Sequence, residues 1–372
     1  MSKDDLLVDA LDGSGITDYD RLIQEFGIEP FSNVTDQMPD NPHFFMTRGL
    51  MFGHTDIKPV FEAMKKKKKF AVMTGIKPSG YYHIGSLATA QELVYFQQQG
   101  GKVFYCIADL EALATNNQSL EESRLNAIDN VADLLALGLD PDPEKCLIYR
   151  QSSHTEVLKM AYVFSSNVTL NTLKGIYGDK TRLGYYNSAL IQVADILLPQ
   201  LIDGPMPTVT PIGADQAPHA RLTRDIARKQ VFQETYKFKL PSFTYHYLIK
   251  GIDGSDKMSK KNPMSVFTLG EDLKKDIKPK IQNALTGGRD TAAEQREKGG
   301  NPDECRVFDL FRFMFEPDDE KLMDRKKRCL SGELLCGYCK KDLLQAIGDF
   351  QDKHNAKKTE MFPIAEKILA SA

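Results

Sequence analysis

The sequence predicts an α/β fold followed by a helical domain. Short apolar runs rich in β-branched residues alternate with amphipathic helical patterns up to about residue 268, which indicates parallel strands joined by helices. Beyond that point few such runs remain, and helical patterns continue to the end of the chain. We therefore expect an N-terminal extension over residues 1–50, a Rossmann-like parallel-sheet domain over 51–268 with a helical insertion at about 115–205, and an all-helical domain over 269–372.

The predicted elements follow one another along the chain. Strands are expected at the apolar runs 70–73, 102–108, 146–149 and 208–212. Helices are expected at 87–99, 119–137, within 154–203, around Arg221, Arg224 and Arg228, and then at 269–285, 307–315, 321–329 and 334–350. The second of these helices starts with a capping box, Ser119 to Glu122. Strands alternating with helices favour a parallel sheet with right-handed crossovers.

The composition is that of an ordinary globular protein. The chain has 372 residues, 41% of them hydrophobic and 27% charged, which is enough for a large core and a second domain. No apolar run approaches the length that spans a bilayer. The acidic N-terminus lacks the basic and apolar regions of a signal peptide. We expect a cytoplasmic protein with no membrane partner.

The net charge of −3 is unevenly distributed. Residues 1–50 hold 3 Lys+Arg and 10 Asp+Glu, a net charge of −7, so the rest of the chain carries −3 + 7 = +4. That mild excess does not by itself indicate RNA binding. A run of five lysines, Lys65–Lys69, is interpreted as a solvated helix end, with a phosphate contact as the alternative.

The first candidate site lies between the first predicted strand and its helix, in the segment TGIKPSGYYHIGS at residues 74–86. A glycine- and proline-rich turn there carries a histidine to the start of a helix. Open α/β sheets bind ligands at this place, because backbone N–H groups and the helix dipole converge on anions. The residues expected to contact a nucleotide are Gly75, Lys77, Ser79, His83 and Gly85.

A second candidate site lies far downstream, in DKMSKK at residues 256–261. It offers three ammonium groups on one loop that follows a glycine-rich approach. We expect Lys257, Met258 and Ser259 to contact the nucleotide, and His83, Lys257 and Lys260 to act in catalysis. Gly213 and Asp215 follow another predicted strand, so they are expected at the same nucleotide.

The two segments together resemble the His-Ile-Gly-His and Lys-Met-Ser-Lys-Ser signatures of class I aminoacyl-tRNA synthetases. Each signature has one departure, because Ser86 replaces the second histidine and Lys261 replaces the final serine. Either motif alone is a weak match, whereas both in order, with room for a nucleotide-binding fold between them, are strong.

Within that class the chain, from about residue 18, is similar to tryptophanyl-tRNA synthetases of the archaeal and eukaryotic type. The segments that carry the resemblance are FGHTD at 52–56, GADQAPH at 213–219, RLTRD at 221–225, LTGGRDT at 285–291, EQR at 294–296 with Gly299-Gly300, and LLCGYCK at 334–340. The resemblance implies ATP-dependent activation of L-tryptophan, with Mg²⁺, and its transfer to the 3′ end of tRNA(Trp). It also implies an anticodon-binding role for the helical domain.

The resemblance further implies that Glu111, Gln192 and Gln216 hold the ammonium and carboxylate of tryptophan. Carboxylate and amide oxygens accept from an ammonium, and amide NH₂ groups donate to a carboxylate. The eukaryotic members bind the indole N–H with a Tyr and a Gln, and the corresponding positions here are Met73 and Cys106. The partner of the indole N–H is therefore not identified by the sequence.

Three alternatives stay open. A tyrosyl-tRNA synthetase shares the signatures but lacks the Thr-Gly-Gly-Arg segment. A non-catalytic paralogue that binds RNA or a nucleotide would be consistent with the departures at Ser86 and Lys261. The second lysine, Lys260, is retained, and the increased positive charge of the loop argues against decay. A small nucleotidyltransferase with a similar motif is disfavoured by the length of the chain and its helical domain.

Four of the six cysteines lie close together in sequence, with 23, 6 and 2 residues between Cys305, Cys329, Cys336 and Cys339. Such a cluster in a reducing compartment favours a metal site. Basic neighbours such as Arg328 and Lys340 are expected to favour thiolates. The spacing resembles that of a 4Fe–4S site in some tryptophanyl-tRNA synthetases, with one extra residue in the first interval. Zinc is the alternative, and four unrelated buried thiols are the other interpretation.

We also expect a two-fold homodimer formed through the helical insertion at about 115–205. The segment is apolar and mostly helical, and the family members are similar in this respect. Two-fold dimers are the commonest soluble oligomers.

Overall fold

The structure, a computed structural model, describes residues 19–256, 258 and 262–371. It divides into two compact units. The sheet unit comprises the described residues of 1–80, 89–247 and 361–372, and the helical unit comprises 81–88 and the described residues of 248–360. The division into three functional domains stays a prediction.

The sheet unit is built on a seven-stranded sheet with the order β1-β2-β7-β6-β3-β4-β5. The strands are β1 (Glu29–Pro30), β2 (Met51–Thr55), β3 (Ala71–Ile76), β4 (Lys102–Ile107), β5 (Cys146–Arg150), β6 (Thr208–Gly213) and β7 (Ser242–His246). The five strands from β7 to β5 are parallel. Four of them, β3 to β6, lie where the sequence predicts strands, and β7 is an additional parallel strand that the sequence analysis does not predict. Strands β1 and β2 add an antiparallel edge beside β7. The expected α/β fold is therefore confirmed, with a mixed sheet.

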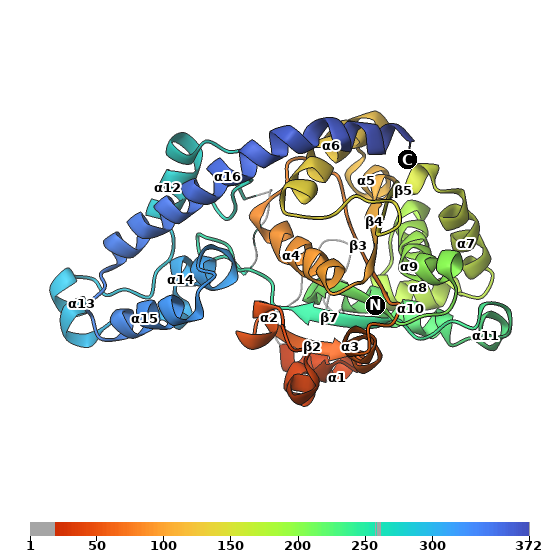
Figure 1. Ribbon diagram of the computed structural model, residues 1–372, viewed down its shortest axis with the longest axis horizontal. Coiled ribbons are helices and arrows are strands. Elements are labelled where there is room, and N and C mark those ends of the chain that lie inside the picture. Colours follow the sequence, from red (N-terminus) through yellow and green to blue (C-terminus); the bar gives the residue numbers. More distant parts are fainter. Residues whose placement is uncertain (1–18, 257, 259–261, 372) are drawn as a thin grey trace. The chain divides into compact units, whose positions relative to one another are not determined.

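Helices connect the strands and cover the sheet (Figure 1). In the sheet unit they are α1 (Tyr19–Phe26), α2 (Phe44–Thr47), α3 (Lys58–Lys65), α4 (Ile84–Gln98), α5 (Asp109–Asn116), α6 (Leu120–Ala136), α7 (Thr155–Ser165), α8 (Leu170–Tyr177), α9 (Leu183–Asp203), α10 (Ala217–Ala227) and α11 (Gln230–Tyr236), with the first turn of α4 assigned to the helical unit. Helix α9 packs against α5, α7 and α10 and against strands β3, β4 and β6. It therefore brings its side chains to the centre of the sheet.

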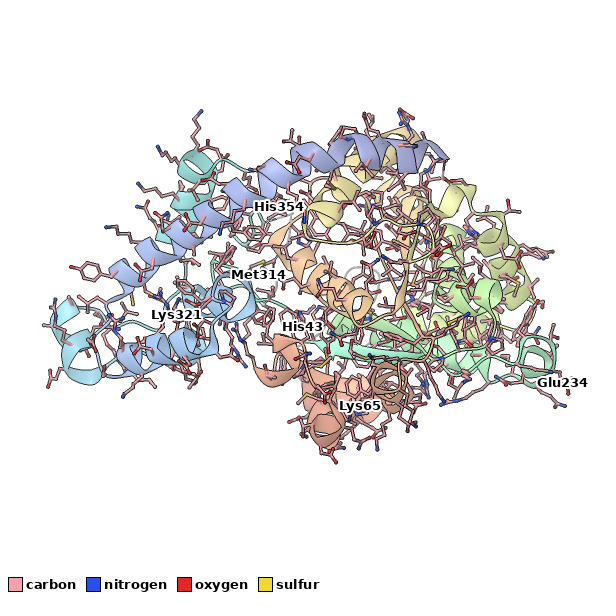
Figure 2. The ribbon with its side chains drawn as sticks, viewed as in Figure 1. His43, Lys65, Glu234, Met314, Lys321 and His354 are labelled. Carbon is pink, nitrogen blue, oxygen red and sulfur yellow. The ribbon has the colours of Figure 1, made fainter. Side chains whose placement is uncertain are left out.

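Local sequence explains where several helices begin and end. The Ser119 hydroxyl accepts a hydrogen bond from the backbone N–H of Glu122 at 3.1 Å, which confirms the predicted cap of α6. Lys65–Lys69 are all exposed at the end of α3, and Figure 2 labels the first of them. Lys66 pairs with Glu62 at 3.0 Å, one turn earlier on the helix. The run is a solvated helix end in this structure, as interpreted from the sequence.

The helical unit contains α12 (Lys278–Gln282), α13 (Ala292–Lys298), α14 (Arg306–Leu310), α15 (Asp319–Leu330) and most of α16 (Cys336–Ser371). The helix predicted over 269–285 is shorter than expected. It consists of a π-helical turn at Leu273–Ile277 followed by α12, and Asp272 caps it by accepting from the N–H groups of Lys274 and Lys275. In the described part of the chain, no helix has the length and apolarity needed to cross a membrane.

Candidate active site

The candidate site of the sheet unit lies at the carboxyl edge of its parallel strands. Ile76 of β3 is in register with Ile107 of β4, which in turn is in register with Arg150 of β5. Strand β6, on the other side of β3, ends at Gly213. The segments that follow these strands therefore emerge side by side, which is where open parallel sheets bind ligands.

The turn after β3 is held by side chains from the region of α6. The carbonyl oxygen of Pro78 accepts from the amides of Gln118 at 2.7 Å and Asn126 at 3.1 Å, and that of Gly80 accepts from Asn130 at 3.0 Å. A Cβ at Gly75 would lie 2.5 Å from the backbone oxygen of Cys106, so glycine is required by the neighbouring strand. The predicted nucleotide-binding turn is thus fixed in place before any ligand binds.

Lys77, which follows β3, and Glu111, which follows the neighbouring strand β4, form an ion pair. The Lys77 ammonium lies 3.1 Å from a carboxylate oxygen of Glu111 and 3.2 Å from the hydroxyl of Thr115. The side chains of Lys77 and Glu111 are 25% and 22% exposed, so the pair faces an accessible site but is largely screened from bulk water. Lys77, which is predicted to contact the nucleotide, is therefore a direct partner of Glu111, which is predicted to contact the amino acid.

Two of the three residues predicted to hold tryptophan contact each other, and the third is linked to the same helix, α9, through Gln151. The Gln192 amide on α9 donates to the amide oxygen of Gln216, just after β6, at 3.1 Å. The backbone N–H of Glu111 donates to Gln151 at 3.4 Å, and Gln151 reaches α9 through Asp195 at 2.7 Å. One hydrogen-bonded chain thus connects the ends of β4 and β5 with the middle of α9.

Asp195 is a candidate that the sequence interpretation missed. Its carboxylate is 1% exposed and accepts from the Tyr149 hydroxyl at 2.8 Å and from Gln151, and it also hydrogen-bonds Cys106. Burial raises the pKa of Asp195 to about 7, despite these hydrogen bonds, which act in the opposite direction. The available signal was its position three residues after Gln192, on the same face of a helix.

His83 belongs to the helical unit and is hydrogen-bonded to Ser86. The Ser86 backbone N–H donates to Nδ1 at 3.2 Å, and its hydroxyl lies 3.2 Å from Nε2. A Cβ at Gly85 would come within 3.1 Å of the imidazole, so this glycine makes room for the ring. The serine that departs from the family signature therefore orients the histidine.

The chain around the lysine loop is tied to the histidine segment. His83 forms an antiparallel bridge with Thr268, and the N–H of Ile84 donates to Phe267 at 3.2 Å. Asp253 hydrogen-bonds Ser255 at 2.7 Å and Asn262 at 2.6 Å, which closes the base of the loop. Lys257, Ser259 and Lys260 lie outside the described residues, so of the predicted loop contacts the structure places only Met258, whose N–H donates to Ile249.

The four clustered cysteines line one cavity in the helical unit. Cys305, Cys329, Cys336 and Cys339 surround it together with Thr286, Phe308 and Arg325. The space that the centres of water molecules can occupy is about 20 Å³, room for roughly one water. No group of three or more His, Cys, Asp or Glu side chains has the geometry to hold a single metal ion in the ranges 19–256, 258 and 262–371. The chain segments therefore converge as the spacing predicts, without forming an ion site.

The expectation that basic neighbours favour thiolates is wrong. Burial raises the pKa of Cys329 to about 11 and that of Cys339 to about 12, although Arg325 lies 3.6 Å from the Cys339 sulfur and acts in the opposite direction. Lys340 does not help, because it donates to the backbone oxygens of Gln282 and Ala284. Without a bound cation, the Cys329 and Cys339 thiols are protonated at neutral pH.

Two features of the cavity nevertheless suit a sulfur-bound group. Backbone N–H groups of Gly287, Val307 and Phe308 point at the sulfur of Cys305, as they do toward metal-bound thiolates. A Cβ at Gly288 would lie 2.7 Å from the sulfur of Cys336, so the Thr-Gly-Gly-Arg segment is glycine-rich where it passes the thiols. The four thiols are the donor type that such a group requires, but the cavity between them has room for about one water, so a larger group would require the side chains to move apart.

Comparisons with known proteins agree with one another. The family model of class I tRNA synthetases for tryptophan and tyrosine matches residues 65–351. The tryptophan–tRNA ligase of Methanocaldococcus jannaschii is 38% identical over 361 residues, covering 95% of each chain, and that of Archaeoglobus fulgidus is 37% identical over 404 residues, covering 92% of this chain and 95% of the other. The crystal structure of tryptophanyl-tRNA synthetase from Aeropyrum pernix matches with a TM-score of 0.88 and 38% identity, covering 97% of this chain and 98% of that one.

Proposed function

The chain belongs to the class I tRNA synthetases of the tryptophan and tyrosine group, and we propose that it activates L-tryptophan with ATP and transfers it to the 3′ end of tRNA(Trp). One observation in the structure carries this proposal. Glu111, Gln192 and Gln216, which the resemblance assigns to the amino acid, gather at the carboxyl edge of the sheet beside the turn predicted to hold the nucleotide. Tryptophan–tRNA ligases that match nearly the whole chain support tryptophan over tyrosine.

The first reaction step joins the tryptophan carboxylate to the α-phosphate of ATP and expels pyrophosphate with its Mg²⁺. The protein must align the carboxylate with the phosphate and neutralise charge that develops on the leaving phosphates. We assign the alignment to Glu111, Gln192 and Gln216. Charge neutralisation falls to His83 and to the loop lysines Lys257 and Lys260. Gly75, Lys77, Ser79, Gly85, Gly213, Asp215, Met258 and Ser259 are the remaining proposed ATP contacts.

Asp195 is our candidate for the partner of the indole N–H. It hydrogen-bonds Cys106, one of the two positions at which eukaryotic members place an indole partner. An aromatic N–H donor buried in a pocket requires an acceptor, and a carboxylate is a stronger acceptor than a neutral group. A polar partner of this kind also rejects ligands that lack the donor.

The amino-acid-dependent exchange of pyrophosphate into ATP tests the proposed reaction. Tryptophan is expected to stimulate exchange, and tyrosine at the same concentration is expected to give a rate lower by a factor of at least about 10⁴. Charging of tRNA(Trp) transcript is expected to follow. Exchange stimulated by tyrosine alone would identify a tyrosine enzyme. Nucleotide or RNA binding without exchange for any amino acid would identify a non-catalytic paralogue.

The helical unit is proposed to bind the anticodon, and the cytoplasm is the proposed site of action. The four cysteines of this unit are proposed to hold a 4Fe–4S cluster. A cluster accommodates four thiolates without the convergence that one ion demands, and it would hold together three segments of the unit. Its role would be structural, because the activation chemistry transfers no electrons.

We expect protein purified without oxygen to contain iron and sulfide and to show the visible absorbance of a thiolate-bound cluster. Cys336→Ser is expected to lose both the iron and the absorbance. Cys146→Ser, a change at a buried cysteine of the sheet unit, is the matched control and is expected to retain them. Stoichiometric zinc without iron would identify a zinc site in place of the cluster. Four freely titrating thiols, with neither iron nor zinc bound, would refute both assignments.

A homodimer through the helical insertion is the remaining proposal. The insertion exposes large apolar side chains on α6 to α9, namely Leu125, Leu158, Tyr162, Leu170 and Leu183. Tyr162 is 81% and Leu183 is 71% exposed. Helices α7 and α9, which carry Leu158, Tyr162 and Leu183, pack against each other, and exposed large apolar side chains are common at subunit interfaces.

Light scattering at micromolar concentration is expected to give a dimer mass, and Tyr162→Asp is expected to give a monomer. A charge placed in a desolvated interface weakens association by roughly 2–5 kcal/mol. Val231→Asp on α11, at an exposed apolar residue outside the insertion, is expected to stay dimeric. A monomer in the unmodified protein would contradict the proposal.

A further inference from the structure

The Lys77–Glu111 pair places a lysine ammonium on the carboxylate that the proposed function assigns to the amino group of the substrate. The distance between the ammonium nitrogen and the carboxylate oxygen is 3.1 Å, and Thr115 accepts a second hydrogen bond from Lys77 at 3.2 Å. A lysine ammonium and the ammonium of an amino acid are chemically alike, since each is a primary cation with three donors. In the described part of the chain, Lys77 is the one cation paired with Glu111.

We propose that Lys77 occupies the ammonium site in the absence of tryptophan, and that tryptophan displaces it toward the phosphates of ATP. This inference rests on the proposed function. The two ammonium groups compete, because two cations in contact with the same partly buried carboxylate repel each other. Amino-acid binding thus breaks the Lys77–Glu111 pair and forms a substrate–Glu111 pair.

The released lysine has a defined destination. Lys77 sits in the turn after β3, whose backbone is fixed by Gln118, Asn126 and Asn130. The backbone of this residue therefore stays in place while its long side chain changes partners. A phosphate bound at the turn offers the displaced ammonium a new anion, so the positive charge moves from the amino-acid site to the nucleotide site.

The exchange of partners makes the binding of the two substrates cooperative. Tryptophan frees Lys77 for ATP, and ATP, by attracting Lys77, frees Glu111 for tryptophan, because a coupling between two sites is reciprocal. The coupling depends only on the amino group of tryptophan. Indole-3-propionate, which is tryptophan without its ammonium, does not compete with Lys77 and is expected to bind independently of the nucleotide.

Calorimetric titration of the full chain with tryptophan, with and without α,β-methylene-ATP and Mg²⁺, measures the coupling. The bridging carbon blocks cleavage between the α- and β-phosphates, so only binding is observed. In the unmodified protein the nucleotide analogue is expected to tighten tryptophan binding by a factor of about 10 and to leave indole-3-propionate binding unchanged. Equal effects on the two ligands would refute the proposal without requiring any variant.

Lys77→Met and Lys77→Gln remove the resident ammonium. Both variants are expected to bind tryptophan about 3–10 times more tightly than the unmodified protein when no nucleotide is present, and to lose the coupling. Lys102→Met is the matched control, because it breaks an ion pair of similar exposure with Asp203 at the opposite edge of the sheet, and it is expected to keep the coupling. Unchanged or weaker tryptophan binding in both Lys77 variants would contradict the displacement.

The outcomes separate this inference from the proposed function. If the unmodified protein binds no tryptophan and catalyses no exchange, the proposed function fails. If it binds tryptophan and catalyses exchange but the coupling does not depend on the ammonium or on Lys77, the displacement alone fails.

Discussion

Glu111→Gln is expected to lower kcat/KM for tryptophan in pyrophosphate exchange by a factor of about 100 or more. The carboxylate is the negative group that meets the substrate ammonium, and loss of one partner of a largely buried charge pair costs about 2–5 kcal/mol. Glutamine keeps the size of the side chain and one accepting oxygen, so the change isolates the charge. Most of the loss should appear in KM, because the ammonium is bound equally in the ground state and the transition state.

Steady-state exchange rates over a range of tryptophan concentrations measure this effect. Glu144→Gln, an exposed residue in the loop before β5, is the control with the same chemistry away from the site. Exchange by the Glu111 variant with both kcat and KM unchanged would remove Glu111 from the amino-acid site. A fall in kcat alone would place its role in the transition state instead.

The sequence anticipated the geometry of the candidate site where that geometry depends on one segment. The turn after β3 consists of consecutive residues. Gly75 is required there by the neighbouring strand, and Lys77 is directed into the site, so this part of the site can be predicted from one segment of sequence. The four parallel strands β3 to β6 were likewise predictable from buried apolar runs. Strands β2 and β7 were not, because β2 contains Gly53 and His54, and β7 is a mixture of polar and aromatic residues that is nevertheless buried throughout.

Properties that depend on packing between distant segments could not be predicted from the sequence. The thiols of Cys329 and Cys339 were expected to ionise because basic residues stand beside them in the chain, yet burial controls their pKa. Lys340 turns away to two backbone oxygens. The spacing of Asp195 from Gln192 places both on one helix face, but it does not indicate that the carboxylate is buried and accepts from Tyr149 and Gln151.

Asp195→Asn is expected to weaken tryptophan binding by a factor of about 10–100 above pH 7, because the indole N–H loses a charged acceptor worth about 1.5–3 kcal/mol. The change is close to isosteric, and the Tyr149 hydroxyl can rotate to accept from the new amide. β-(3-Benzothienyl)alanine carries sulfur in place of the indole N–H, so the variant should bind this analogue as well as the unmodified protein does. Equal losses for the two ligands would show a general disturbance of the pocket.

The pH dependence provides an independent test of the same residue. Because burial raises the pKa of Asp195 from 3.8 to about 7, the folded protein holds a proton there that the unfolded chain has lost. The stability contributed by this protonation is fully present below about pH 4 and is lost as the pH rises through about 7. Stability therefore falls over this range, by up to about 1.4 kcal/mol per pH unit, and the asparagine variant should lack that decline.

Tryptophan binding follows the opposite direction, because the ionised carboxylate is the better acceptor for the indole N–H. In the unmodified protein, affinity is expected to increase between pH 6 and pH 8, roughly the interval in which a group with this pKa ionises. The Asp195→Asn variant should show no such rise, and Asp203→Asn, at an exposed ion pair of the same unit, should retain it. Stability that falls while affinity rises identifies a carboxylate whose burial is unfavourable for folding and useful for recognition, whereas a flat affinity profile would assign Asp195 to the core alone.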